Sequence, residues 1–329
     1  MVRLKNSYSI IESKASLILE KKVFILSQCS DGGNSEVFKI SDENGVNYTL
    51  KLYPPLELDT RRRLHSEYSA LTYLSNIPSL IVPMPLGNSE QDNMAIYTWL
   101  EGVRPQVNTM AISEMLNFVR TLKNFWDKSE IKYTIQAMGG CLSGQEILRQ
   151  VVLKRKKLLL LQGEKELHNF ILNYFDSILE KLQFNDTDLE DHHRCLNPGD
   201  FGPHNMILTD SGMAFIDMEY FGYDDPVKQI SDVLIHPAIN LNEDQISFFL
   251  KNVLDIYKND KKLVERLISH FPAYSLRWAM IVLNIFIPSS LAIRSKAQNL
   301  PEDFKSIQLK KAKKILSEIE YKIEIIKGL

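Results

Sequence analysis

The sequence NPGDFGPHNMILTDSGMAFIDMEYFGYDDP occupies residues 197–226 and decides the fold. It places Asp200 and Asn205 in the spacing D-x-x-x-x-N and puts a second acid, Asp217, twelve residues further on. Between Asn205 and Asp217, two apolar runs separated by a Thr-Asp-Ser-Gly turn predict a β-hairpin. Such a hairpin returns Asp217 to the neighbourhood of Asn205, so that two chain segments face one metal site.

The types and spacing of these residues fit phosphoryl transfer. A carboxylate at Asp200 can take the proton of an acceptor hydroxyl, while the amide oxygen of Asn205 and the carboxylate of Asp217 hold Mg²⁺. A single Asp is common in turns and at helix caps, but the joint spacing of the three residues argues against that simpler reading. Glu219, two residues beyond Asp217 on an extended chain, points to the same side and is a further candidate Mg²⁺ ligand.

The stretch resembles the superfamily of aminoglycoside phosphotransferases and choline kinases, the small-molecule relatives of protein kinases. The family pattern is H-G-D-x-x-x-x-N, then I-D-x-E or I-D-x-D, then G-D-P. The sequence matches it at Gly199, Asp200, Asn205, Ile216, Asp217, Glu219, Asp225 and Pro226. It departs at Pro198, where the family usually has His. Proline offers no side-chain donor but stiffens the turn, so we interpret Pro198 as a change in how the loop is braced.

This resemblance implies an α+β, two-lobed, protein-kinase-like fold, with a small β-rich N-terminal lobe and a larger helical C-terminal lobe. The first hundred residues agree with it. Alternating apolar runs over 23–53, broken by two turns rich in Asp, Asn and Gly, predict three strands joined by hairpins. A helix is expected over 59–76, with Asp59 as its cap, and a strand over 93–100 leads into a hinge.

Three parts of the small lobe are candidates for holding ATP. Gly32 and Gly33, in the first hairpin turn, would let backbone N–H groups approach phosphate oxygens, although such a turn alone is more often a plain hairpin. Lys51 would neutralise the α- and β-phosphates, the alternative being a solvated lysine on an edge strand. Glu67, on the helix, would pair with Lys51 and orient its ammonium group. Their order ahead of Asp200 resembles that of a kinase.

Beyond residue 104 the pattern is mostly helical. Apolar residues at helical spacing predict helices at 112–126, 144–161, 164–182, 244–257, 261–270, 274–286 and 302–326. We place the N-terminal nucleotide-binding lobe at residues 1–101 and the C-terminal catalytic and acceptor-binding lobe at 102–329. Asp225 is expected to open a further helix and to brace the loop, and His204 is assigned a structural role.

Composition excludes several classes of protein. A chain of 329 residues with 44% hydrophobic and 24% charged residues suits two lobes with separate cores. Its net charge of -2 favours neither nucleic acid nor an anionic membrane as a partner. The three cysteines form no CxxC pair, and no apolar run approaches the ~20 residues of a membrane span. The N-terminus lacks the apolar core of a signal peptide, so a cytoplasmic location is expected.

The sequence therefore predicts a small-molecule kinase that uses ATP and Mg²⁺ and acts on a hydroxyl group. A protein kinase is disfavoured, because Asp217 opens D-M-E instead of D-F-G and no A-P-E follows. Residues 104–329 carry 29 acidic and 29 basic side chains, a balance that favours a sugar or an amino alcohol over a polycationic antibiotic. Two alternatives are left open: an aminoglycoside-modifying kinase and, because of Pro198 and the atypical glycine loop, a nucleotide-binding pseudokinase with a regulatory role.

Overall fold

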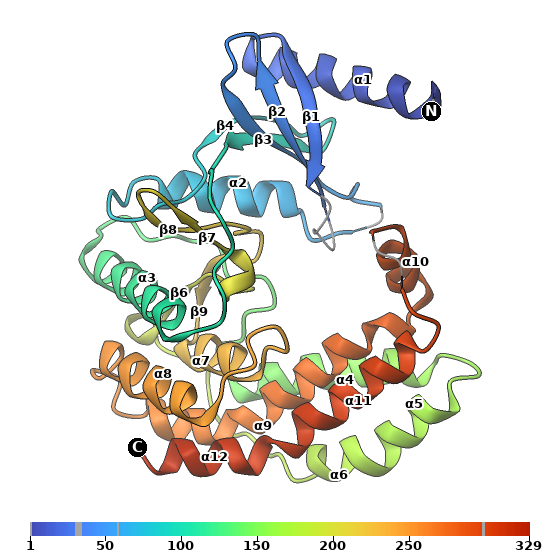
Figure 1. Cartoon of the computed structure of the whole chain (residues 1–329). Coiled ribbons are helices and arrows are strands. Elements are labelled where there is room, and N and C mark those ends of the chain that lie inside the picture. Colours follow the sequence, from blue (N-terminus) through green and yellow to red (C-terminus); the bar gives the residue numbers. More distant parts are fainter. Residues whose placement is uncertain (1, 30–34, 58, 298–299) are drawn as a thin grey trace. The chain divides into compact units, whose positions relative to one another are not determined.

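The computed structural model describes residues 2–29, 35–57, 59–297 and 300–329, and the chain divides into two compact units (Figure 1). Unit 1 comprises Met1–Arg104 and Asn205–Phe221, and unit 2 comprises Pro105–His204 and Gly222–Leu329. The chain therefore passes from unit 2 into unit 1 after His204 and returns after Phe221. Unit 1 thus contains the predicted hairpin in addition to the first hundred residues.

Unit 1 is built on a five-stranded antiparallel sheet in the order β1-β2-β3-β5-β4. The strands are β1 Val23–Cys29, β2 Glu36–Asp42, β3 Asn47–Leu52, β4 Pro85–Ser89 and β5 Met94–Thr98. The three strands predicted over 23–53 and the strand predicted over 93–100 are confirmed. The edge strand β4 was not predicted, because Pro85 indicated a break in the chain. Proline is tolerated there, since it is the first residue of a strand with one unpaired side.

A helix that the sequence did not predict, α1 Val2–Leu19, packs on this sheet. Its Ala15 is fully buried, and Tyr8 meets Phe38 of β2 edge to face with ring centroids 5.8 Å apart. Together with Ile40 and Leu50 these residues form the apolar core of unit 1. Such packing supplies most of the stability of a short amphipathic helix, because burial of apolar surface is favourable wherever two elements meet.

The predicted helix of unit 1 is α2 Arg63–Leu74, which begins later than expected. Its N-cap position is Arg62, in the left-handed region at φ 49°, and no side chain caps the helix there. The expectation that Asp59 caps this helix is therefore wrong. Asp59 instead accepts hydrogen bonds from Arg61 and from Arg63 Nε, at 2.6 and 2.7 Å. A charged pair with two guanidinium groups satisfies the carboxylate better than a cap would.

The predicted hairpin is confirmed as β7 Met206–Thr209 and β8 Gly212–Phe215. It joins unit 1 through two isolated bridges, Val103 with Leu208 and Ile81 with Ala214. Gly102 permits the first bridge, because a Cβ atom at this position would lie 2.2 Å from the Leu208 carbonyl oxygen. Gly102 thus has a packing role, and only glycine fits at this position without a shift of the backbone.

Unit 2 is mostly helical. Its α-helices are α3 Thr109–Lys128, α4 Gly144–Leu159, α5 Lys165–Phe170, α6 Asp176–Leu179, α7 Pro226–Ile235, α8 Glu243–Ile256, α9 Leu263–Val282, α10 Pro288–Ala297, α11 Phe304–Ser317 and α12 Ile319–Lys327. A π-helical turn, η1 Ile171–Phe175, joins α5 to α6, and a two-stranded sheet pairs β6 Cys195–Asn197 with β9 Gly222–Asp224. A β-rich unit and a helical unit confirm the α+β class. In the described part of the chain, no helix combines the length and apolar character needed to cross a lipid bilayer.

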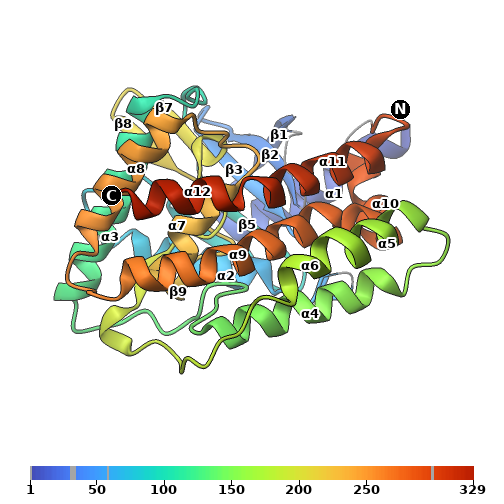
Figure 2. The same ribbon diagram turned by 90° about the horizontal axis from the view of Figure 1, so that it is seen from below.

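The helix boundaries of unit 2 correct the sequence-based expectation in two places. The helices predicted at 261–270 and 274–286 are one helix, α9, which continues through Pro272. Figure 2 shows α9 running between α11 and α4, and it contacts α7 and α12 as well. This packing offsets the cost of an interior proline, which is about 3 kcal/mol. The helix predicted at 302–326 is instead two helices, α11 and α12, which meet at Glu318.

Candidate active site

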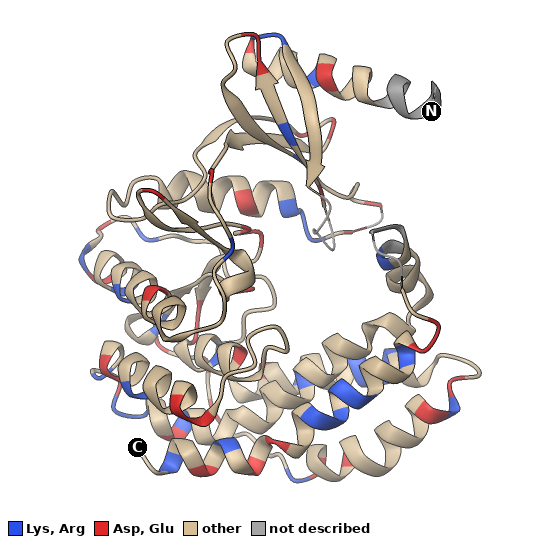
Figure 3. Cartoon of the chain, in the orientation of Figure 1, with Lys and Arg blue, Asp and Glu red and all other residues tan. Residues whose placement is uncertain are grey.

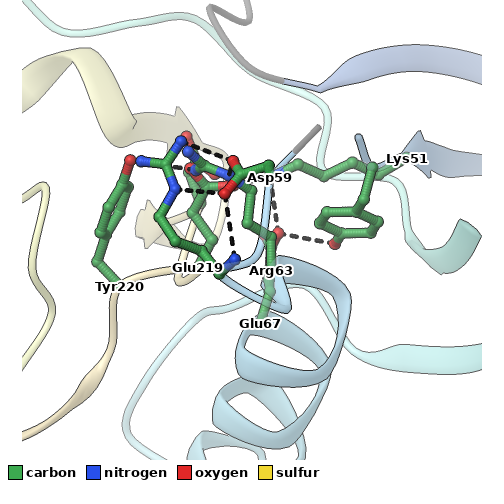
Figure 4. A network of polar contacts seen from close by, with 9 residues as sticks. Lys51, Asp59, Arg63, Glu67, Glu219 and Tyr220 are labelled. Carbon is green, nitrogen blue, oxygen red and sulfur yellow. Dashed lines mark hydrogen bonds and ion pairs between the residues drawn. The ribbon is translucent and has the colours of Figure 1, made fainter. Parts of the chain in front are cut away.

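Lys51 is the centre of the polar network in unit 1 (Figure 4). It lies on β3 between β2 and β5, so the alternative of an edge-strand lysine is wrong. Its Nζ donates to Glu67 Oε2 at 2.7 Å and to Asp217 Oδ1 at 2.6 Å. The side chain is buried, with 9% of its surface exposed. The pairing of Lys51 with Glu67 that the sequence predicted is therefore present, and Asp217 is a second partner.

Burial and charge act in opposite directions on these groups. Burial disfavours the Lys51 ammonium, but the charges of Asp217, Glu67 and Glu219 outweigh it and raise the pKa of Lys51 well above its usual value. Burial raises the pKa of Glu67, whereas Lys51 lowers it. Tyr53 supports Glu67 by donating its hydroxyl to Oε2 at 2.7 Å. Lys51 thus stays charged, and its carboxylate partner is held in one position.

Three carboxylates surround this one buried ammonium group. One oxygen each of Glu67, Asp217 and Glu219 lies within 4.8 Å of the other two. Asp217 enters this cluster from the end of β8 with φ 64°, a left-handed conformation that Asp adopts more easily than most residues. Carboxylate oxygens are hard donors, which Mg²⁺ prefers as ligands. Here three carboxylates surround one ammonium group, so negative charge is in excess. The cluster therefore fits a divalent cation.

Glu219 has a partner that the sequence did not reveal. Its Oε1 is hydrogen-bonded to Arg63 Nη1, and the same nitrogen donates to the Tyr220 hydroxyl at 3.1 Å (Figure 4). Glu219 Oε2 lies 3.9 Å from Lys51 Nζ. Burial raises the pKa of Glu219 to about 7, against the opposing charges of Lys51 and Arg63. Arg63 lies one helical turn before Glu67, on the same face of α2. This spacing was the sequence signal that could have placed Arg63 near the carboxylate cluster.

Asp200, the predicted base, lies in unit 2 between two histidines. Its Oδ1 is 2.9 Å from His204 Nε2 and 3.1 Å from His236 Nε2. The two imidazole rings stack with centroids 4.7 Å apart and planes at 11°. Burial works against the charge of Asp200, but the hydrogen bonds from both histidines outweigh it and hold the pKa of Asp200 below its usual value. Asp200 is thus ionised near neutral pH.

The backbone before Asp200 is fixed by buried polar contacts. Gly199 has φ 86°, which favours glycine, and its N–H donates to Asn197 Oδ1 at 2.9 Å. Asn197 Nδ2 in turn donates to Asp224 Oδ2 at 3.0 Å, and Asp224 Oδ1 accepts the N–H of Cys141. This network keeps the turn in place although Pro198 provides no side-chain donor.

Asp225 opens α7, as expected. Its Oδ1 accepts the N–H of Val227 at 2.9 Å and lies 3.1 Å from Arg266 Nη2.

Asn205, the other predicted Mg²⁺ ligand, is half-buried at the start of the second segment of unit 1. Its carbonyl accepts the N–H of Ile216 at 3.0 Å, which closes the base of the hairpin. Its role as a ligand stays a prediction.

The structure groups the predicted site residues by unit. Lys51, Glu67, Asp217 and Glu219 come together in unit 1, which also contains Asn205. Asp200 lies in unit 2. Gly32 and Gly33 lie outside the described residues. No sequence signal indicated His236, which is 36 positions from Asp200 in the chain.

Comparison with known proteins identifies the class. The model of the phosphotransferase enzyme family (APH) matches residues 25–245, and since this is more than half of the chain, the chain belongs to that family. Its family is one of phosphotransferases, and its fold is that of the protein-kinase-like enzymes. No curated protein sequence matches the chain.

Solved structures show the same fold at low sequence identity. Choline kinase from Cryptosporidium parvum Iowa II is 13% identical with a TM-score of 0.64, and the match covers 97% of this chain and 98% of that one. The gentamicin complex of APH(2")-IIa is 16% identical with a TM-score of 0.58, covering 87% and 93% of the two chains. The amicoumacin kinase hAmiN, in complex with AMP-PNP and Ca²⁺, is 15% identical with a TM-score of 0.56, covering 96% and 95%.

Proposed function

We propose that the chain uses ATP and Mg²⁺ to phosphorylate a hydroxyl group of a small neutral or singly charged molecule, such as a sugar or an amino alcohol. One observation carries the proposal: Glu67 and Asp217 converge on the buried Lys51 ammonium at 2.7 and 2.6 Å, with Glu219 close by. An isolated structural ion pair needs one carboxylate for one lysine. The excess of carboxylates is suited to a nucleotide bound with a divalent cation.

Each residue then has a distinct role in the transfer. Lys51 contacts the α- and β-phosphates, and Glu67 orients its ammonium group. Asp217, Asn205 and one oxygen of Glu219 would hold Mg²⁺, which would neutralise charge on the phosphate groups. Gly32 and Gly33 lie outside the described residues, and their contact with the phosphates is proposed from the sequence alone.

Asp200 acts on the acceptor. With its pKa held low, the carboxylate is a weak base toward a free hydroxyl, so its first task is to accept a hydrogen bond and orient the oxygen for attack. It receives the proton late, when bonding to phosphorus has made the hydroxyl acidic. Positioning and electrostatic stabilisation supply most of the rate enhancement.

The similar structures support the proposed use of ATP and a divalent cation more strongly than they support the proposed class of acceptor. The amicoumacin kinase carries AMP-PNP and Ca²⁺, a nucleotide analogue with a divalent cation. The same fold serves enzymes named for choline and one in complex with gentamicin, so the fold alone does not select the acceptor. Unit 2 carries 28 Lys and Arg against 26 Asp and Glu, a balance that supports an acceptor without several positive charges.

The test is a screen of ATP consumption with sugars, amino alcohols and aminoglycosides as acceptors. Asp200→Asn is the matched control, because it should bind nucleotide without transferring phosphate. Acceptor-dependent turnover in the wild type, absent in the variant, supports the proposal. Nucleotide binding without turnover on any acceptor would contradict it and favour the regulatory pseudokinase.

A further inference from the structure

His236 has a tautomer that its surroundings fix. Its Nδ1 accepts the backbone N–H of Ala238 at 3.1 Å, and its Nε2 lies 3.1 Å from Asp200 Oδ1. A nitrogen that accepts a hydrogen bond carries no proton, and a neutral imidazole has one proton to place. The proton of His236 is therefore on Nε2, where it is donated to Asp200.

The His236 ring is also held in one orientation. One face stacks on His204 with the planes at 11°, and Trp278 meets the ring edge to face at 4.7 Å. Trp278 is fixed in turn, because its Nε1 donates to Asp232 Oδ1 at 2.7 Å while Lys228 Nζ holds the other oxygen of Asp232 at 2.5 Å. The side chain of His236 is 13% exposed, so little solvent competes for its hydrogen bonds. These contacts all lie within unit 2.

We propose that His236 is a positioning residue for Asp200: its Nε2–H fixes the plane in which the Asp200 carboxylate meets the acceptor hydroxyl. The inference rests on the proposed function of Asp200 as the residue that orients the acceptor. His204 donates to the same oxygen at 2.9 Å, and Gly202 leaves room for its ring, since a Cβ there would lie 2.9 Å from His204 Cε1. Two donors on Oδ1 brace a carboxylate that follows Pro198.

The same three side chains have the composition of a metal site. Ligand atoms of Asp200, His204 and His236 lie within 4.8 Å of one another, and two imidazoles with a carboxylate suit Zn²⁺. Metal on Nε2 of His236 would move the proton to Nδ1 and break the hydrogen bond from Ala238. The observed contacts therefore favour the hydrogen-bonded arrangement, and metal binding is an outcome that the test must distinguish.

The kinetic test compares two variants of His236. His236→Gln places an amide N–H close to the position of Nε2, whereas His236→Phe keeps an aromatic ring for Trp278 and His204 but has no donor. We expect His236→Phe to lower kcat by roughly 10–100-fold with the KM for ATP nearly unchanged, because misorientation of the reacting group acts on the chemical step. His236→Gln should recover most of that loss. His192→Phe, at an exposed histidine outside the site, is the matched control with unchanged kcat.

A second measurement needs no acceptor and so separates this inference from the proposed function. Nitrogen NMR of the free wild-type protein at neutral pH should show His236 as the Nε2–H tautomer, and it also serves if His236→Phe does not fold. An Nδ1–H tautomer or a charged ring would overturn the inference, as would equal kcat in His236→Phe and the wild type, or an equal loss in both variants. Stoichiometric Zn²⁺ binding that disappears in His236→Gln would also overturn it and assign the cluster to a metal.

Discussion

Asp200 and Asp217 are the same residue type in opposite electrostatic settings. Asp200 accepts hydrogen bonds from two imidazoles, whereas Asp217 lies 2.6 Å from an ammonium group and close to two further carboxylates. A carboxylate close to other carboxylates is stabilised by a cation, whereas a carboxylate that accepts hydrogen bonds from imidazoles is held in position to accept one from a hydroxyl. The two acids are thus suited to different tasks, and substitutions should separate these tasks.

Asp200→Asn should lower kcat by roughly 10²–10⁴-fold, the usual contribution of a general base. Affinity for Mg·ATP should stay close to that of the wild type, since Asp200 is proposed to act on the acceptor. Steady-state kinetics and a direct nucleotide titration check both parts. A variant with near-normal kcat would show that another group takes the proton.

Asp217→Ala should weaken Mg²⁺-dependent nucleotide binding more than Asp200→Asn does. Removing this carboxylate would take away a proposed oxygen ligand of Mg²⁺, and it leaves Lys51 with fewer negative partners. The measurement is a Mg²⁺ titration of nucleotide binding at fixed ATP concentration. If the two variants and the wild type share one Mg²⁺ dependence, the metal is held by other residues.

Two elements of unit 1 are coupled through the charged pair of Lys51 on β3 and Glu67 on α2. Lys51→Met and Glu67→Gln should therefore be strongly non-additive in kcat/KM, because each removes the partner that makes the other effective. A double-mutant cycle measures the coupling, with Lys39→Met and Glu101→Gln, a pair at 3.1 Å whose glutamate is exposed, as the matched control. Additive losses at Lys51 and Glu67 would mean that the contact does not contribute to catalysis.

The sheet formed by β6 and β9 contains a buried acid whose titration should affect stability. Burial raises the pKa of Asp224 to about 6, against the opposing charge of Lys228. The folded state then binds the proton more tightly than the unfolded state, whose pKa is ordinary. The proton on Asp224 therefore contributes most to the free energy of unfolding below about pH 4, and this contribution is lost as the pH rises through about 6. For a pKa shift of this size the loss is about 3 kcal/mol.

Denaturant unfolding between pH 4 and pH 7 checks this dependence. The stability of the wild type relative to Asp224→Asn should fall as the pH rises over that range, since the amide does not titrate. Asp188→Asn, at an exposed position, should show no such trend. A constant difference between the wild type and Asp224→Asn would place the pKa of this carboxyl near its ordinary value.

The sequence predicted those elements whose signals are local. The hairpin of β7 and β8 follows from its turn residues, whereas the contact of Lys51 with Glu67 was implied by the resemblance to kinases. The prediction of a helix end near Pro272 was wrong, because tertiary packing around α9 offsets the local preference of proline for ending a helix. Arg63 and His236 were missed for a related reason: their partners Glu219 and Asp200 are far away in the chain, and only the fold brings them together.

On the scale of the whole molecule, the segment that decides the fold is divided between the two units. Its hairpin and Asp217 belong to unit 1, while Asp200 and Asp225 belong to unit 2. The residues proposed to hold nucleotide and metal are thus in one unit, and the residue proposed to orient the acceptor is in the other. Acceptor selectivity should therefore depend on unit 2, whose charges can be considered separately.

The charges of unit 2 do not favour a polycation. Figure 3 shows lysines gathered along α11, with acidic residues distributed over other elements. Several of the acids near Asp200 in sequence or space already have basic or indole partners: Asp225 lies with Arg266, and Asp232 lies with Lys228 and Trp278. These two carboxylates are thus already paired, and an acceptor with several ammonium groups would need others to compensate for its desolvation.

A sugar or an amino alcohol should therefore be a better acceptor than an aminoglycoside, as measured by kcat/KM under the same conditions. The comparison belongs at moderate ionic strength, about 0.15 M, where the Debye length of about 8 Å removes long-range attraction of a polycation to scattered surface acids. A preference that persists there reflects contacts in the site, whereas one seen only at low salt reflects the surface. Consistently higher kcat/KM for aminoglycosides at this ionic strength would reject the proposed acceptor class and favour an antibiotic-modifying kinase.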